Sequence, residues 1–169
     1  MLAPFLGYLW CFVRCFVRGP AGRQRFNVLA ALHAVTHELV AVTNDTYINA
    51  QSVCELLRKI AALNVGVPIT LVLDNARYQK CRIVSELAQS LSIELLYLPS
   101  YSPNLNLIER FWKFTKKQVL YSKYYPDFAS FSKAISDCIA DAPTRHKNEL
   151  DSLLTLRFQT FKEPQLLVA

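Results

Sequence analysis

Short apolar runs separated by polar breaks recur along the chain, and their spacing predicts its secondary structure. Residues 26–35 and 38–43 are rich in Val, Leu and Ala, and the break between them at Thr36-His37 is short. This pattern predicts two strands joined as a hairpin. Two further strands are expected over residues 69–74, after Pro68, and over residues 93–98.

Apolar residues at helical spacing predict the remaining elements. Asn49 is expected to open a helix through about Leu63, and Pro143 to interrupt helical structure that resumes and continues to about Phe161. The other helices are predicted at about 81–91, 107–120 and 128–139. A hairpin followed by alternating helices and strands indicates an α/β fold with a mixed sheet, in one domain over residues 1–169.

Composition narrows the classes of partner. The chain has 19 Lys and Arg against 13 Asp and Glu, a net charge of +6, which favours an anionic partner, nucleic acid first and acidic lipid second. The five cysteines form no CxxC pair, so reduced thiols in the cytoplasm are expected. The apolar stretch Leu2–Val17 is interrupted by Arg14, and we interpret it as protein interior rather than a membrane span.

Two carboxylates are the strongest candidates for chemistry. Asp74 ends an apolar strand, and Glu109 lies just inside a predicted helix after a turn-rich stretch, with 34 residues between them. Such positions can meet at one sheet edge, where ligands of open α/β sheets bind and where two carboxylates can hold Mg²⁺ or Mn²⁺. The structural alternatives are that Asp74 caps the next turn and that Glu109 forms a capping box with Asn106.

Basic side chains surround the second of these carboxylates. Between Glu109 and Tyr124 five basic residues oppose that single acid, a local charge of +5 − 1 = +4. The candidates for phosphate contacts are Arg77, Arg110, Lys113, Lys116 and Lys117. The alternative is a solvated helix face over an aromatic core. His33 and His37 are four residues apart but fall in a strand and a turn, so we interpret them as structural or surface histidines rather than metal ligands.

Two motifs at a matching distance resemble the catalytic core of DDE transposases of the mariner superfamily and its bacterial insertion-sequence branch. They are Leu71-Val72-Leu73-Asp74-Asn75-Ala76-Arg77-Tyr78 and Leu98-Pro99-Ser100-Tyr101-Ser102-Pro103-Asn104-Leu105-Asn106-Leu107-Ile108-Glu109-Arg110-Phe111-Trp112. The resemblance implies a ribonuclease-H-like fold shared with retroviral integrases. It also implies cutting and joining of DNA, element ends and target, with two Mg²⁺ or Mn²⁺ ions at Asp74 and Glu109, in the bacterial cytoplasm at the nucleoid.

The sequence departs from the family pattern at its N-terminal end. The family places a first catalytic Asp on its first strand, yet no Asp or Glu occurs between Met1 and His37, and Glu38 and Asp45 come too late. We therefore expect an incomplete first strand, no helix-turn-helix domain, and a fragment with two of three catalytic acids and little or no activity. The alternatives are a non-catalytic DNA-binding or interaction domain, and a scaffold that pairs with a separately encoded N-terminal half or with copies of itself.

Overall fold

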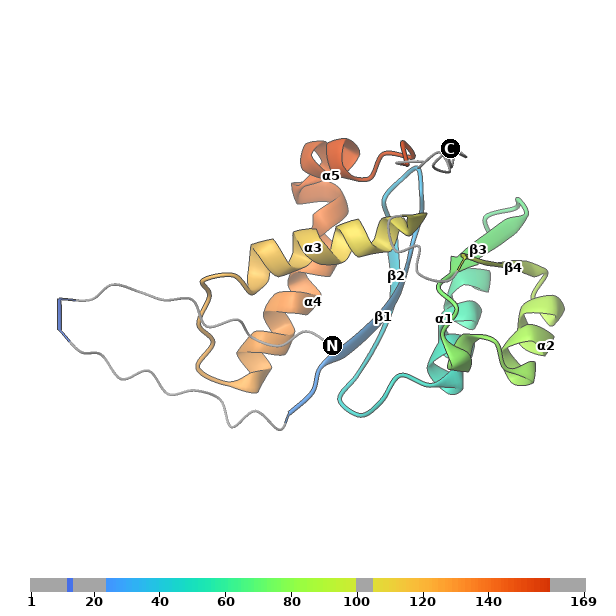
Figure 1. Cartoon of the computed structure of the whole chain (residues 1–169), viewed down its shortest axis with the longest axis horizontal. Coiled ribbons are helices and arrows are strands. Elements are labelled where there is room, and N and C mark those ends of the chain that lie inside the picture. The colour runs from blue at the N-terminus through green and yellow to red at the C-terminus, as the bar shows by residue number, and fades with distance from the viewer. Residues whose placement is uncertain (1–11, 14–23, 100–104, 159–169) are drawn as a thin grey trace, which may run out of the picture.

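The computed structural model describes residues 12–13, 24–99 and 105–158, and Figure 1 shows the arrangement of its helices and strands. In the described part the elements follow the predicted order. Their bounds are β1 (Asn27–Leu32), β2 (Leu39–Asn44), α1 (Ala50–Ala61), β3 (Ile69–Leu73), a 3₁₀ turn η1 (Arg77–Gln79), α2 (Arg82–Ser90), β4 (Ile93–Tyr97), α3 (Leu107–Val119), α4 (Phe128–Arg145) and α5 (Lys147–Leu153).

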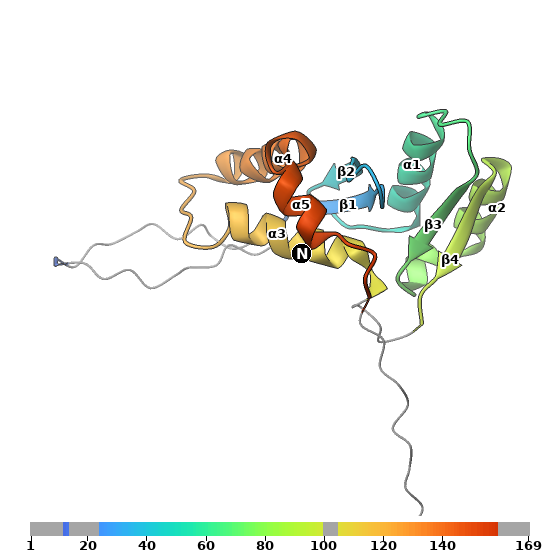
Figure 2. The same ribbon diagram turned by 90° about the horizontal axis from the view of Figure 1, so that it is seen from above.

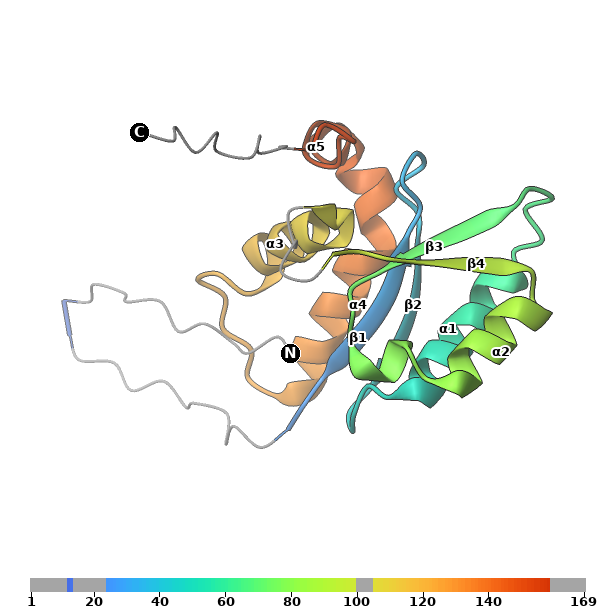
Figure 3. The same ribbon diagram turned by 45° about the vertical axis from the view of Figure 1, so that its right-hand side comes forward.

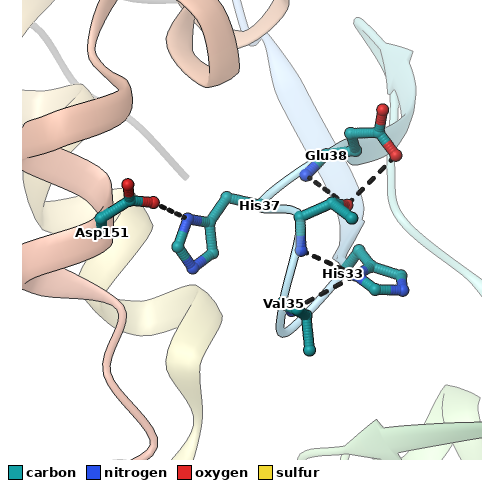
Figure 4. Close-up of polar contacts among 6 residues, drawn as sticks. His33, Val35, His37, Glu38 and Asp151 are labelled. Carbon is teal, nitrogen blue, oxygen red and sulfur yellow. Dashed lines mark hydrogen bonds and ion pairs between the residues drawn. The ribbon is translucent and has the colours of Figure 1, made fainter.

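The hairpin β1–β2 is antiparallel, with Asn27 opposite Asn44 and Leu32 opposite Leu39. Its turn is closed by the His33 amide donating to the Glu38 carbonyl at 2.8 Å, and His37 adopts a positive φ of 61° there. Figure 4 shows the two histidines of this turn pointing apart. His33 Nδ1 accepts from the Val35 and Thr36 amides, whereas His37 Nδ1 lies 3.1 Å from Asp151 Oδ1 of α5. Both histidines therefore have structural partners, as the sequence indicated.

Strands β3 and β4 are parallel and form a separate pair in the described residues, with Ile69 opposite Ile93 and Leu73 opposite Tyr97. Helix α2 connects them and packs with α1 against one face of the pair. The sequence predicted a single mixed sheet, but in the described residues the four strands form two separate pairs. The pairs share α1, whose capping box between Asn49 and Ser52 confirms the predicted start of that helix.

Two apolar cores lie on opposite faces of the hairpin. Leu29, Ala31 and Val42 pack with α1, α2 and β4, in what we call the α1 core. Val28 and Leu32 pack instead among the buried side chains of α3, α4 and α5, the α3–α5 core. Because side chains alternate between the faces of a strand, one hairpin supplies both cores. Figure 2 shows β1 and β2 lying between α1 on one side and the C-terminal helices on the other.

Three expectations are wrong. Pro143 does not end a helix but lies inside α4, where a missing N–H near the C-terminus removes only the bond to the carbonyl four residues earlier. The last helix of the described ranges ends at Leu153, and residues 154–158 form no helix. Most of Leu2–Val17 lies outside the described residues, but Phe12 and Val13 are exposed rather than interior, since nothing in the described part packs over them. No helix within the described ranges is long and apolar enough to span a membrane.

Candidate metal and DNA-binding site

Asp74 is the first residue after β3, and its side chain is exposed. The ends of β3 and β4 are tied together beside it. The Leu98 amide donates to the Leu73 carbonyl at 2.9 Å, and the Asn75 side-chain amide donates to the Leu98 carbonyl. Asp74 therefore leaves the sheet from a fixed strand end. Its carboxylate caps no turn in the described residues, because the N-cap position of η1 is Ala76.

The charge of Asp74 reaches the neighbouring turn. The pKa of the Tyr78 phenol is raised, first by burial and second by the negative charge of Asp74. Arg77 is exposed beside it, and no hydrogen bond or ion pair holds its guanidinium within the described part of the chain. The predicted phosphate candidate nearest Asp74 is thus accessible to an anion.

Glu109 lies in the first turn of α3 and is half-buried. Asn106 caps this helix through its side chain, which accepts from the Ile108 amide at 3.3 Å. The reciprocal bond of a capping box, from the Asn106 amide to the Glu109 carboxylate, is not formed in the described structure. Asn106 therefore caps the helix as the structural alternative expected, but Glu109 does not complete the capping box. Among the described residues the Glu109 carboxylate has neither a hydrogen bond nor an ion pair.

The two acids come from elements that approach each other. Figures 2 and 3 both place the start of α3 near the carboxyl ends of β3 and β4. A strand end carrying a free carboxylate next to a helix start carrying another is an arrangement that oxygen-preferring divalent cations can use. No group of three or more His, Cys, Asp and Glu that could hold a metal occurs in the described ranges.

The other acids considered from the sequence are used or placed differently. Glu38 accepts a hydrogen bond from the Thr36 hydroxyl at 3.1 Å in the hairpin turn (Figure 4). Asp45 is exposed just after β2. Twelve of the 13 acids lie in the described residues, and the remaining one is Glu163. The described acids therefore include no set of three that could hold a metal.

The predicted basic residues of α3 divide into two groups. Arg110 is half-buried and turned toward the C-terminal segment: its guanidinium donates to the carbonyls of Leu153, Thr155 and Arg157 at 3.3, 2.8 and 3.5 Å. It also lies 5.4 Å from the centre of the Phe158 ring. These contacts give Arg110 a structural role that the sequence did not reveal.

The three lysines face outward instead. Lys113 and Lys117 are exposed and Lys116 is half-buried. Lys117 lies 3.6 Å from Glu149, while Lys113 and Lys116 have no ion pair in the described structure. Since Glu109, Lys113 and Lys116 occupy positions i, i+4 and i+7, they share one face of α3.

Asn75 is the feature of the site that sequence reasoning missed. Its side-chain amide joins the two strand ends, while its buried Oδ1 has no hydrogen-bond partner in the described structure. The available signal was its position directly after Asp74, to which the sequence analysis gave no role. Asn75 fixes the backbone from which Asp74 projects.

Comparisons with known proteins agree with this architecture. The family described as DDE superfamily endonuclease matches residues 14–132. An uncharacterized 39 kDa protein of insertion element IS630 from Shigella sonnei is 30% identical over 95 residues, which are 56% of this chain and 28% of that protein. The chain therefore spans about a quarter of the length of this relative.

Two solved structures share the fold. The Mos1 transposase catalytic domain, solved with raltegravir and Mg, has a TM-score of 0.50 and 14% identity, covering 81% of this chain and 84% of that chain. An intasome of simian T-cell lymphotropic virus in complex with PP2A regulatory subunit B56 gamma has a TM-score of 0.52 and 16% identity, covering 65% and 41%. The expected ribonuclease-H-like fold is confirmed. With the family match over most of its length, this chain belongs to the DDE superfamily endonucleases.

Proposed function

We propose that this chain binds DNA beside a weak divalent-cation site and by itself cleaves little or no DNA. The observation that carries the proposal is the pair of carboxylates, Asp74 and Glu109, which have no hydrogen-bond or ion-pair partner among the described residues and lie at adjoining ends of β3 and α3. Uncompensated carboxylates close together repel each other, and a cation between them relieves that repulsion.

The donor set suits one Mg²⁺ or Mn²⁺ ion better than two. Mg²⁺ in phosphate-processing sites is held by one or two carboxylates together with substrate oxygens and water. In this family such ions polarise the phosphodiester and activate the attacking oxygen. Asp74 and Glu109 would hold the ion. The described residues contain no third acid near them, so we infer that affinity is low until DNA adds its own oxygens.

Thermal melting with increasing Mn²⁺ or Mg²⁺ tests the cation site. A ligand at ten times its Kd stabilises the native state by about 1.4 kcal/mol, which raises the melting temperature by roughly 3–5 °C for a chain of this size. Asp74→Asn and Glu109→Gln should each abolish the rise, and Asp141→Asn, at an exposed acid of α4, should keep it. Stabilisation that persists in both site variants would refute the assignment of these ligands.

Cleavage is tested separately, by nicking of DNA that carries the element's end sequence. We expect little or no product from the full chain. Robust metal-dependent cleavage that disappears in Asp74→Ala would mean that another residue completes the site. Glu163→Gln would then be the first variant to examine, because Glu163 is the one acid outside the described residues, followed by Glu38→Gln and Asp45→Asn.

DNA binding is proposed along the face of α3 that leads away from Glu109. Lys113 and Lys116 lie on this face without ion pairs in the described residues and are free to contact phosphates. Lys117 must first leave Glu149, and Arg77 lies at the Asp74 end. We leave Arg110 out of the contact surface, because its donors already bind backbone carbonyls.

The salt dependence of DNA affinity measures these contacts. Each phosphate contact adds about −0.9 to the slope of log K against log salt concentration. The double variant Lys113→Gln with Lys116→Gln should make this slope less negative by about two. Adding Lys117→Gln should change the slope by less than the amount for one further phosphate contact, because Lys117 is paired with Glu149. Lys147→Gln, at an exposed lysine of α5, is the matched control, and an unchanged slope in the double variant would exclude this helix from the interface.

The second candidate is a non-catalytic DNA-binding or interaction domain. It is favoured by the lack of a three-acid group in the described ranges. DNA binding without any stabilisation by metal would support it against the first candidate.

Partners are also proposed on the evidence of the strand edges. Within the described part β1 pairs only with β2, and β3 only with β4, although β1 contributes side chains to both cores. A strand supplied by a separately encoded N-terminal half, or by a second copy, would satisfy these edges. Sedimentation of the chain alone detects self-association, and sedimentation after co-expression with a candidate N-terminal half detects that partner. We also propose that the protein acts at the nucleoid in the bacterial cytoplasm, because its proposed substrate is DNA.

A further inference from the structure

The turn between α3 and α4, residues 120–126, is held firmly at both ends. Leu120 is buried in the α3–α5 core. The Tyr125 hydroxyl donates to the Val119 carbonyl at 2.6 Å, and its ring meets the edge of Phe131 with 5.7 Å between ring centres. Asp127 caps α4 by accepting from the Ser130 amide at 2.7 Å. The backbone of this turn therefore has a defined path.

Three side chains between these anchors are exposed. Tyr121 and Tyr124 are each 51% exposed, and Lys123 between them is exposed as well. Ser122 adopts a positive φ of 56°, which sharpens the turn. Large aromatic side chains that face water from a fixed backbone offer flat surfaces at little entropic cost on binding.

The turn lies at the end of a basic surface that begins at the candidate site. Figure 1 shows it at the end of α3 opposite to β3 and β4. With Arg110 left out, residues 111–126 contain four lysines and no acid, a charge of +4 − 0 = +4. From Glu109 to Leu120 the helix rises about 16 Å, which matches roughly five nucleotide steps of a DNA strand.

We propose that the turn 120–126 is a stacking site for unpaired bases of the DNA that this domain binds, with Tyr124 as its main platform and Tyr121 and Lys123 beside it. The inference rests on the proposed DNA binding along α3. A strand whose phosphates follow Lys113 and Lys116 from the acids would reach the turn after about five nucleotides. Tyrosine rings stack on any base, so the site would select unpaired DNA rather than a particular sequence.

Fluorescence anisotropy with two labelled probes tests the proposal. One is a blunt duplex, and the other is the same duplex with a single-stranded extension of about five nucleotides. The extension should increase the affinity of the full-length chain by about 5- to 150-fold, the range for one stacked base. Tyr124→Ala should remove most of this gain, whereas Tyr124→Phe, which retains the ring, should keep it.

A matched control is available at Tyr47, which is 67% exposed in the loop before α1. Tyr47→Ala should leave the gain unchanged, and the slope of affinity against salt should stay the same in all three tyrosine variants, because stacking releases no counterions. An equal gain in wild type and Tyr124→Ala, with DNA still bound, would overturn the stacking site alone. Failure of every variant and of wild type to bind either probe would instead refute the proposed DNA binding.

Discussion

Replacing Arg110 with alanine gives the sharpest test of how the C-terminal segment is held. The guanidinium contacts three backbone carbonyls between Leu153 and Arg157 and the ring of Phe158. Leu150 just before this segment and Leu154 within it are buried in the α3–α5 core, so loosening the segment also disturbs that core. Arg110→Ala removes all donors at once and leaves those carbonyls to water.

The contacts of Arg110 set the size of the expected loss in the free energy of unfolding. The 2.8 Å bond to Thr155 is charge-assisted and is expected to contribute about 1.5–3 kcal/mol. The two longer bonds add little, and a cation–π contact adds about 0.5–1 kcal/mol. We therefore expect Arg110→Ala to lower the free energy of unfolding by about 3 kcal/mol. For a chain of this length that corresponds to a melting temperature lower by roughly 6–12 °C.

Thermal melting measured by circular dichroism provides the assay, with limited proteolysis to locate the loosened segment. Arg110→Lys keeps the charge but loses the planar fork, so it should recover less than half of the loss. Arg77→Ala, at an exposed arginine without partners in the described residues, should melt like wild type. The reasoning fails if Arg110→Ala melts within about 1 °C of wild type and is cleaved no faster after Leu153.

Three further outcomes follow from local contacts. Asn49→Ala removes the side chain that accepts from the Gln51 and Ser52 amides, so urea unfolding should show a free energy of unfolding lower by about 1 kcal/mol. Gln51→Ala, at an exposed position, should change this free energy little. Burial raises the pKa of the Cys138 thiol to about 11 from 9.0, so the folded protein holds this proton more tightly than the unfolded chain does. The stability that the protonated thiol contributes is full below pH 9.0 and is lost as the pH rises through about 11. Urea midpoints compared across that range should show this loss in wild type and not in Cys138→Ala. Asp74→Asn should lower the raised pKa of Tyr78, seen as an earlier rise of phenolate absorbance, whereas a pKa that stays in place would show that the charge of Asp74 does not reach that ring.

The parts of the fold that sequence predicted well are those decided by local chemistry. The cap at Asn49 and the strands before Asp74 and after Leu91 depend on neighbouring residues, and the structure confirms them. Asp74 and Glu109 were identified because a motif fixes both the residues and their separation.

The parts that sequence could not predict depend on distant partners. Nothing near Arg110 in the chain indicates that carbonyls 43 to 47 residues later would bind its guanidinium. Pro143 was expected to end a helix, but Ala142 and Ile139 on the buried side of α4 hold that turn in the core. Tertiary packing therefore outweighed a local signal there.

The hairpin β1–β2 has a consequence for the two acids themselves. Asp74 directly follows β3, which packs against the α1 core, whereas Glu109 belongs to α3, whose buried side chains are part of the α3–α5 core. The hairpin separates the two blocks and gives alternate side chains to each. Because both cores pack on it, the hairpin couples the position of β3 to that of α3. A volume change at Leu29 or Val28 would shift one of these elements relative to the other without touching either acid.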